Sequence, residues 1–383
     1  MTSLVIDILK EEREQKGISA EWDAAVAESY LTTLSQSPWY FAWRDTFAPK
    51  EAVIITVREN GRLTGVMPLA KVHTDARGLY LPQVTTFTVA DYQVPVVAAG
   101  ASDLVLPRMV DAAIEHFGKR ALYWWANIPT CEAASTALES HLRARGMHIS
   151  EEFEVAPRLD IAGRSYAEVE ATWAPSHRTD VRRQRKRLAA KGPTSLWQPS
   201  DLNTARTLLE EFFAVHDQKW LSQGRPGRFQ ESLQRKHFRS IVDRLWGRGL
   251  HLSALRCGDV NVSFGFGFFS GGWVQWYRPT YRHEYQNLSP GKVHIALLVE
   301  EACRCGWRGI DFLQGDEGYK LQWSNQQIRV ANYYASYYAW SPAYIWFTKG
   351  KPYVRHRLGP MYMRTKARLQ NASLRLRKKT SKG

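Results

Sequence analysis

Cysteine is scarce in this chain, which has four cysteines among 383 residues, at positions 131, 257, 303 and 305. The last two lie two positions apart, and on a helix this spacing directs their side chains to different faces. No Cys-x-x-Cys pair occurs in the sequence. The spacing argues against a zinc site, so we expect no metal, and a few unpaired thiols suit a reducing compartment.

Long hydrophobic runs are also missing. The apolar stretch at the N-terminus is short and is followed at once by charged residues, unlike a signal peptide. Residues 330–348 are free of charge, but they are rich in tyrosine and contain Pro342, so we predict aromatic strands instead of a membrane span. We expect a cytoplasmic protein with at most peripheral contact with the inner membrane.

Acidic residues are absent from the tail 345–383, which carries 12 Lys or Arg. A second basic segment, residues 176–191, has seven basic residues against one aspartate. Because the whole chain has a net charge of +15, the remainder is mildly acidic, at −3. This distribution argues against a protein that coats nucleic acid and favours an enzyme that meets anions at defined places.

The first half of the chain predicts a succession of helices and strands. A β-hairpin over residues 52–72 is indicated by two apolar runs around the turn residues Asn60-Gly61. The other expected elements are a helix over 22–44, a helix at 103–117, a strand at 121–128 and a helix at 131–146. The succession closes near Leu159.

The second half predicts three helical regions, then a three-stranded meander, then a helix and a strand. The helices are expected at 166–191 with an interruption near Pro175, at 201–221 and at 230–247. The meander covers 250–256, 261–269 and 273–279, and is followed by a helix at 290–305, a strand at 309–313 and a final aromatic hairpin. The composition and element order predict a mixed α/β fold.

The predicted helix at 290–305 begins with features typical of an anion-binding helix N-terminus. Ser289 suits the N-cap, Pro290 suits the first helical position, and Gly291 allows close approach to the backbone. Lys292 adds a positive charge to the partial charge of the helix end. The alternative is an ordinary capped helix without a ligand.

A polar segment follows the strand at 309–313 and groups carboxylates, a phenol and an amine, in Asp316, Glu317, Tyr319 and Lys320. Such a group suits proton transfer and charge stabilisation. The alternative is a solvated turn. Because this segment lies one helix after the anion-binding motif, both can face one cleft.

These motifs occur in a characteristic order. The order runs from the basic helix RTDVRRQRKRLAAKG through HDQKW (216–220), Tyr281, LSPG (288–291), DFLQG (311–315) to Tyr319-Lys320. In the first half, SPWYFAWRDTF, GRLTGVMPLA and ADYQVPVV add to it. Together, over about residues 35–345, they resemble the CelD/BcsL-type GNAT acetyltransferases, which are associated with bacterial cellulose and exopolysaccharide synthesis and are related to the Fem peptidyltransferases.

The resemblance implies two tandem GNAT-like domains with mixed sheets. We expect a degenerate N-terminal domain at 1–160, an acyltransferase domain at 161–345 and a basic tail at 346–383. It implies that Ser289, Pro290, Gly291 and Lys292 contact the phosphates of acyl-CoA, most simply acetyl-CoA. It also implies that Lys320 stabilises the developing oxyanion and that Tyr319 protonates the leaving thiolate, unless Tyr319 serves only in packing.

His216 is the best general-base candidate from the residues themselves, because its unperturbed pKa is near 6.5. It lies four positions before Trp220 on a predicted helix, so both share a face. The alternative is a structural histidine, and Asp311 and Glu317 are weaker candidates for a base. We assign acceptor binding to Arg178, Arg182, Trp220, Tyr281 and Glu317.

The expected function is transfer of an acyl group from acyl-CoA to the nitrogen or oxygen of a saccharide or cell-envelope precursor, linked to a nucleotide or a lipid. A Fem-like transferase that uses aminoacyl-tRNA and a non-catalytic adaptor on the same fold are the alternatives. The tail suits an anionic membrane surface, with a disordered end or binding of tRNA as its other interpretations.

Overall fold

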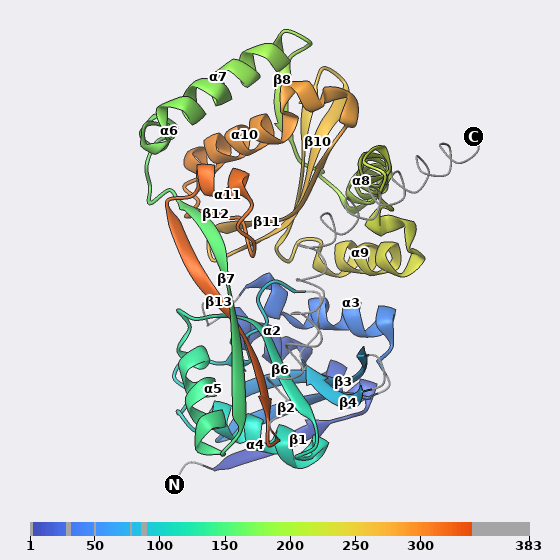
Figure 1. Ribbon diagram of the computed structural model, residues 1–383, viewed down its shortest axis with the longest axis vertical. Helices are drawn as coiled ribbons and strands as arrows, with labels where there is room; N and C mark the ends of the chain where they lie inside the picture. The colour runs from blue at the N-terminus through green and yellow to red at the C-terminus, as the bar shows by residue number, and fades with distance from the viewer. Residues whose placement is uncertain (1–2, 28–31, 50, 77–78, 86–89, 339–383) are drawn as a thin grey trace, which may run out of the picture.

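The computed structural model describes residues 3–27, 32–49, 51–76, 79–85 and 90–338. Two lobes lie one above the other and are joined by a pair of long strands (Figure 1). The basic tail and the second half of the predicted aromatic hairpin lie outside the described residues. In the described part, no helix combines the length and the apolar character needed to cross a membrane.

The N-terminal lobe alternates strands with short helices. In chain order its elements are β1 (Leu4–Leu9), α1 (Glu12–Gly17), α2 (Ser19–Ala27), the 3-10 turn η1 (Thr33–Ser35), α3 (Ser37–Phe47), β2 (Glu51–Glu59), β3 (Arg62–Ala76), β4 (Leu79–Thr85), β5 (Val96–Val97), α4 (Val105–Phe117), β6 (Leu122–Pro129), α5 (Ala133–Ala144) and β7 (His148–Asp160).

The C-terminal lobe contains the meander that the sequence predicts. Its elements are α6 (Tyr166–Thr172), α7 (Pro175–Ala189), β8 (Thr194–Trp197), α8 (Leu202–Ser222), η2 (Arg228–Gln230), α9 (Ser232–Leu245), β9 (Leu250–Cys257), β10 (Val260–Ser270), β11 (Trp273–Tyr281), η3 (His283–Leu288), α10 (Pro290–Arg304), β12 (Gly309–Asp311), α11 (Gly318–Trp323) and β13 (Gln326–Ser336).

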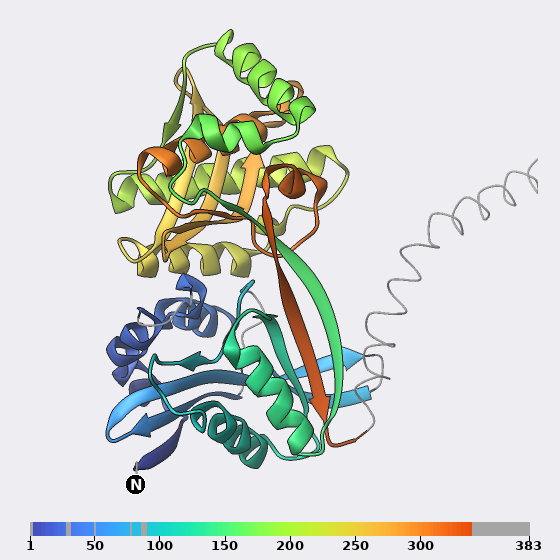
Figure 2. The ribbon, with the colours of Figure 1, turned by 90° about the vertical axis from the view of Figure 1, so that its left-hand side faces the viewer.

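One mixed sheet of 13 strands runs through the described part of both lobes, in the order β1-β2-β3-β4-β6-β13-β7-β12-β11-β10-β9-β8, with β5 beside β3. Its centre is the long antiparallel pair β7–β13, visible side by side in both views (Figure 2). β7 pairs with β12 at its C-terminal end, while β13 pairs with β6 of the first lobe. We therefore propose that the two domains share these strands and do not separate cleanly at residue 160.

Local signals explain most of the elements. The hairpin β2–β3 is confirmed, and its turn residues Asn60 and Gly61 adopt φ of 50° and 83° as a two-residue turn requires. The interruption at Pro175 is also confirmed, because α6 ends at Thr172 and α7 begins at Pro175.

Two expectations were wrong in detail. A continuous helix over 22–44 does not form, because α2 ends at Ala27, Thr32 caps the 3-10 turn η1 through the N–H of Leu34, and α3 starts anew with Pro38 in its first turn. The polar segment after β12 is not only a loop, since residues 318–323 form the short helix α11.

The two lobes share one hydrophobic core, which lies between α3 of the first lobe and α8, α9 and one face of the β9–β11 meander. Trp39 on α3 is fully buried and makes edge contacts with Phe268 and Tyr277, at centroid distances of 5.2 and 5.9 Å. The opposite face of the meander is covered by α7 and α10. The sheet therefore separates an α8/α9 face, closed by the first lobe, from an α7/α10 face.

Replacing Trp39 with Ala should destabilise the protein by about 3 to 5 kcal/mol, because it removes a large buried ring from the core that both lobes share. Urea unfolding measures the change. Leu221→Ala is the control, because Leu221 is 56% exposed and its loss should cost less than about 0.5 kcal/mol. Equal effects of the two substitutions would contradict a shared core.

Candidate functional site

The sheet opens between β11 and β12. These parallel strands pair only over Trp273–Gln275 and Gly309–Asp311, after which β12 ends and β11 continues to Tyr281. On its other edge β11 carries a bulge, because its register against β10 shifts between Gln275 and Arg278. In the described structure β11 beyond Gln275 therefore has a backbone edge without a strand partner, which can pair with the amides of an extended ligand.

Helix α10 starts where β11 and η3 end, and it has Pro290 in its first turn as predicted. Ser289 occupies the N-cap position, but it adopts a left-handed conformation with φ of 48° and its side chain makes no capping bond, contrary to the expectation of a serine cap. The N–H groups of Lys292 and Val293 bond to the carbonyl of Ser289. A side chain at Gly291 would meet only Tyr281, at 3.9 Å. This leaves open space for a ligand at the start of the helix.

Lys292 does not point freely into solvent. Its ammonium pairs with Asp180 of α7, and this contact, followed by that of Arg183, lowers the pKa of Asp180 to about 2. The pair fixes a positive charge beside the start of α10, between that helix and α7. The cation is thus positioned in advance for an anion, although Asp180 offsets part of its charge.

Lys320 is buried on α11, with 5% of its surface exposed. Its Nζ donates to the backbone oxygen of Gln314 at 2.6 Å and to Oε2 of Glu317 at 2.9 Å. Tyr319 is 37% exposed, yet desolvation of its hydroxyl, followed by the charge of Glu317, raises the pKa of Tyr319. Tyr319 is therefore protonated at neutral pH, and Glu317, Tyr319 and Lys320 lie together at the start of α11.

Two residues that sequence reasoning assigned no role lie beside Lys320. Asp91 comes from the first lobe, where burial raises its pKa to about 6 against the opposing charges of Arg278 and Lys320. Arg278 on β11 packs its guanidinium 4.8 Å from the ring of Tyr277, and its buried Nε has no hydrogen-bond partner among the described residues. The signal for Asp91 was the segment ADYQVPVV, in which it is the only ionisable residue besides a tyrosine.

Asp311 connects this cluster to the rest of the fold. The hydroxyl of Tyr92 lies 3.0 Å from both carboxylate oxygens of Asp311, Arg158 donates to it at 2.8 Å, and the N–H of Leu313 does so at 2.8 Å. Because Tyr92 follows Asp91 directly, these bonds position Asp91. Asp311 therefore acts as a structural carboxylate at the point where the strands separate.

His216 and Trp220 form a pair on α8. The indole N–H of Trp220 donates to Nε2 of His216 at 3.1 Å, and Nδ1 lies 3.5 Å from Asp217. Burial lowers the pKa of His216 to about 4, so the ring is neutral at pH 7 with its acceptor nitrogen occupied. Next to this pair, the ammonium of Lys219 lies 3.9 Å from the ring of Tyr281. The structure thus brings Trp220 and Tyr281 to neighbouring positions at the end of β11.

The basic helix α7 lies on the other face of the sheet. Arg182 donates to Glu170 at 3.0 Å, and Arg178 donates to the backbone oxygen of Ala171 at 3.5 Å. The structure does not bring Arg178 and Arg182 together with His216 and Trp220, because α7 packs on α10 while α8 covers the opposite face. Within the described ranges, no group of three or more His, Cys, Asp or Glu side chains is arranged to hold a metal ion.

The family comparison agrees with this arrangement. Residues 175–321 match the family model described as an acetyltransferase (GNAT) domain. This part of the chain is a GNAT acetyltransferase domain. No curated protein matches the chain.

Solved structures show the same fold over most of the chain. FemX is 13% identical with a TM-score of 0.58 and covers 88% of this chain and 98% of its own. A conserved protein of unknown function from Bacteroides thetaiotaomicron is 12% identical with a TM-score of 0.56, covering 86% and 99%. The C-terminal domain of a putative lysylphosphatidylglycerol synthetase from Agrobacterium fabrum is 10% identical with a TM-score of 0.53, covering 86% and 94%. The predicted mixed α/β fold with two GNAT-like halves is confirmed.

Replacing Asp91 with Asn should stabilise the protein at pH 8 by about 1 to 3 kcal/mol and change little at pH 4. The pKa of Asp91 is raised from 3.8 to about 6 in the folded protein. Below pH 3.8 the carboxyl is protonated in both the folded and the unfolded state, and the protein keeps its full stability. As the pH rises through about 6, ionisation of the buried carboxyl lowers the free energy of unfolding. Urea unfolding at both pH values measures the difference. A destabilised variant at pH 8 would show that Asp91 is instead held by its ion pairs with Arg278 and Lys320.

Proposed function

We propose that the protein transfers an acetyl group from acetyl-CoA to a hydroxyl or amine of a saccharide or cell-envelope precursor. The observation that carries this proposal is the open edge of β11. The start of α10 lies at one end of this edge, and Lys320 lies across the gap that opens where β12 ends. An extended thioester donor fits such a slot, because its amides can pair with the free backbone edge and its phosphates can meet the helix N-terminus.

In this proposal the donor phosphates contact the start of α10 at Ser289, Pro290 and Gly291, with Lys292 as the nearest cation. Arg178 and Arg182 belong to the same face of the sheet as Lys292, since Lys292 pairs with α7. We propose them as a further contact for phosphates on this face. The acceptor then approaches from the opposite face, where Trp220, Tyr281 and Glu317 lie near the end of β11 and the start of α11.

The chemistry follows from the charges around the gap. The acceptor nucleophile attacks the thioester carbon, and the ammonium of Lys320 stabilises the oxyanion that forms on the carbonyl oxygen. Asp91, ionised above about pH 6, accepts the proton of the nucleophile, and Tyr319 donates a proton to the leaving thiolate. His216 positions Trp220, because its acceptor nitrogen already binds that indole.

A Fem-like enzyme that takes its acyl group from aminoacyl-tRNA is the alternative donor class, and the likeness to FemX supports it only at the level of the fold. A non-catalytic adaptor would need neither donor. Measured binding of acetyl-CoA and of tRNA separates these possibilities, since tRNA binding weakens steeply with salt.

Acetyl-CoA should bind the protein with a dissociation constant below about 1 mM, and Lys292→Gln should weaken this binding about three- to tenfold by removing the cation nearest to the phosphates. Isothermal titration calorimetry measures both. Lys236→Gln, at an exposed position on α9, is the matched control and should leave the affinity unchanged. Absence of heat at millimolar acetyl-CoA would refute the acetyl-CoA proposal.

Lys320→Met should lower the turnover number about 100- to 1000-fold while it changes the affinity for acetyl-CoA less than about threefold, because the ammonium acts mainly on the transition state. The assay is release of free CoA thiol with a mixture of cell-envelope saccharides as acceptors. Lys236→Met is the control for loss of a lysine. An unchanged turnover in Lys320→Met would favour the adaptor.

A further inference from the structure

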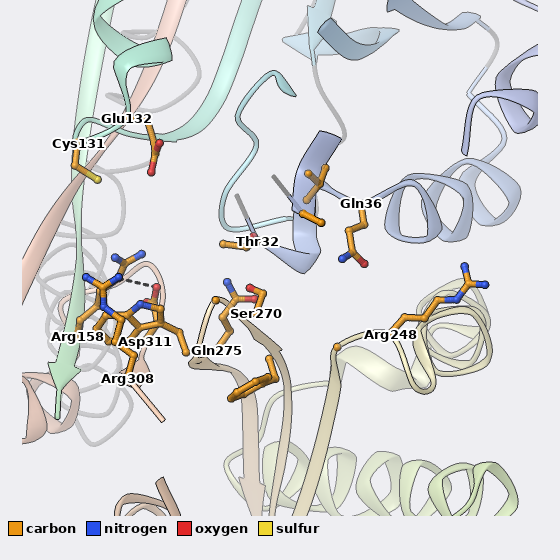
Figure 3. A pocket seen from close by; sticks show the side chains of 16 residues that line it. Thr32, Gln36, Cys131, Glu132, Arg158, Arg248, Ser270, Gln275, Arg308 and Asp311 are labelled. Atoms are coloured by element: carbon orange, nitrogen blue, oxygen red, sulfur yellow. Dashed lines mark hydrogen bonds and ion pairs between the residues drawn. The ribbon is translucent and has the colours of Figure 1, made fainter. Parts of the chain in front are cut away.

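A cavity of about 780 Å³ lies between the two lobes, apart from the open edge of β11. Its walls come from η1 and the start of α5 on one side and from the β10–β11 turn, β7 and β12 on the other (Figure 3). This volume is in the range of about 300 to 1000 Å³ that small-molecule sites occupy. It is large enough for a saccharide.

Positive charge gathers on one wall of the cavity. The guanidinium groups of Arg158 and Arg308 lie 5.1 and 5.2 Å from the ring of Trp273, and Figure 3 shows both side chains beside Asp311. Arg158 uses its Nε to bind Asp311, and Arg308 has no ion pair among the described residues. Arg248 on the far wall is a third cation, while Asp311 and Glu132 supply two negative charges. Fork-shaped guanidinium groups held on an aromatic ring suit a carboxylate or a phosphate.

A second, independent observation comes from Gln275. Its side chain lines the cavity and is 1% exposed, yet its Oε1 has no hydrogen-bond partner in the part of the chain that the structure describes. A buried carbonyl oxygen without a partner is costly, and a ligand hydroxyl or N–H in the cavity would remove that cost. The cavity therefore offers anion binding and an acceptor for a hydroxyl group within one enclosure.

The cavity is connected to the proposed reaction centre through Asp311. This carboxylate lines the cavity and at the same time binds the hydroxyl of Tyr92, the residue next to Asp91. Gln275 and Arg278 pair with Phe268 and Phe266 of β10, whose side chains both lie in the shared core, because the bulge of β11 falls between Gln275 and Arg278. A molecule held in the cavity thus lies on the same sheet face as Asp91 and Arg278, opposite the proposed donor phosphates.

We propose that this cavity binds the anionic end of the acceptor, and that the acceptor is a saccharide whose carboxylate or phosphate contacts Arg158 and Arg308 and whose hydroxyl donates to Gln275. The proposal rests on the proposed acyl-transfer function. Glucuronate and glucose 1-phosphate represent the two anionic groups, and glucose is the neutral counterpart.

Calorimetric titration of the full chain with the three sugars tests this inference. Glucuronate or glucose 1-phosphate should bind at least about tenfold more tightly than glucose, and the tighter one identifies the anionic group. Arg308→Gln should weaken binding of that anion about tenfold, and Gln275→Leu should weaken binding of the sugar about threefold. Arg304→Gln is the matched control, because Arg304 is an exposed arginine outside the cavity that pairs with Glu301.

Equal affinity for glucose and the anionic sugars would overturn the inference, as would unchanged anion binding by Arg308→Gln. Absence of binding of both anionic sugars at about 10 mM, in protein that binds acetyl-CoA, would also overturn it while the acyl-transfer proposal stands. Anion binding that depends on Arg308, in protein that fails to bind acetyl-CoA, would instead refute the donor and keep the cavity as a saccharide site.

Discussion

The buried carboxylate of Asp311 is the contact on which the arrangement of the site depends. It lies at the end of β12, where the sheet separates, and it is 1% exposed. It accepts hydrogen bonds from Tyr92 of the first lobe, from Arg158 of the shared strand β7 and from the N–H of Leu313. A buried carboxylate is tolerated only with such partners, because an unpaired charge in this environment would cost several kcal/mol. The bonds therefore fix three segments relative to one another, and they join the proposed reaction centre to the cavity between the lobes, which Asp311 also lines.

The chemistry that the gap between β11 and β12 can support depends on the opposing charges of Asp91, Arg278 and Lys320. Burial alone would raise the pKa of Asp91 further, but the two cations limit the rise to about 6. With Asp91 ionised, the carboxylates of Asp91 and Glu317 face the cations of Arg278 and Lys320, so fixed charges of both signs surround the gap. Such fixed charges stabilise an oxyanion without the reorganisation that water would need. The same balance keeps Asp91 able to take up a proton near neutral pH.

Much of the fold was predictable from local patterns, and less of the site was. The β2–β3 hairpin, the meander and the start of α10 depend on neighbouring residues, such as Asn60-Gly61 and Pro290, and the sequence shows these signals directly. Lys320 was proposed from the sequence because it lies in a compact polar segment. Asp91 and Arg278 were assigned no role because their significance comes from a contact between the lobes, of the kind that joins Tyr92 and Asp311 across 219 residues. No periodicity reports such a contact.

The basic helix α7 is a strong signal in the sequence, but the structure separates it from some of the residues that the sequence analysis grouped with it for acceptor binding. Because α7 packs on α10, its arginines and lysines lie across the sheet from Trp220. Beyond Gln275 and Asp311 the strands β11 and β12 part, which opens a gap in the sheet. In the proposed reaction, a donor on one face and an acceptor on the other meet at this gap, near Lys320 and Asp91. The family match covers residues 175–321, and Asp91, Tyr92 and the Trp39 contact all lie outside it. The matched domain alone would lack Asp91, the proposed proton acceptor, and would expose the meander face that Trp39 covers, so the first lobe completes both the core and the proposed site.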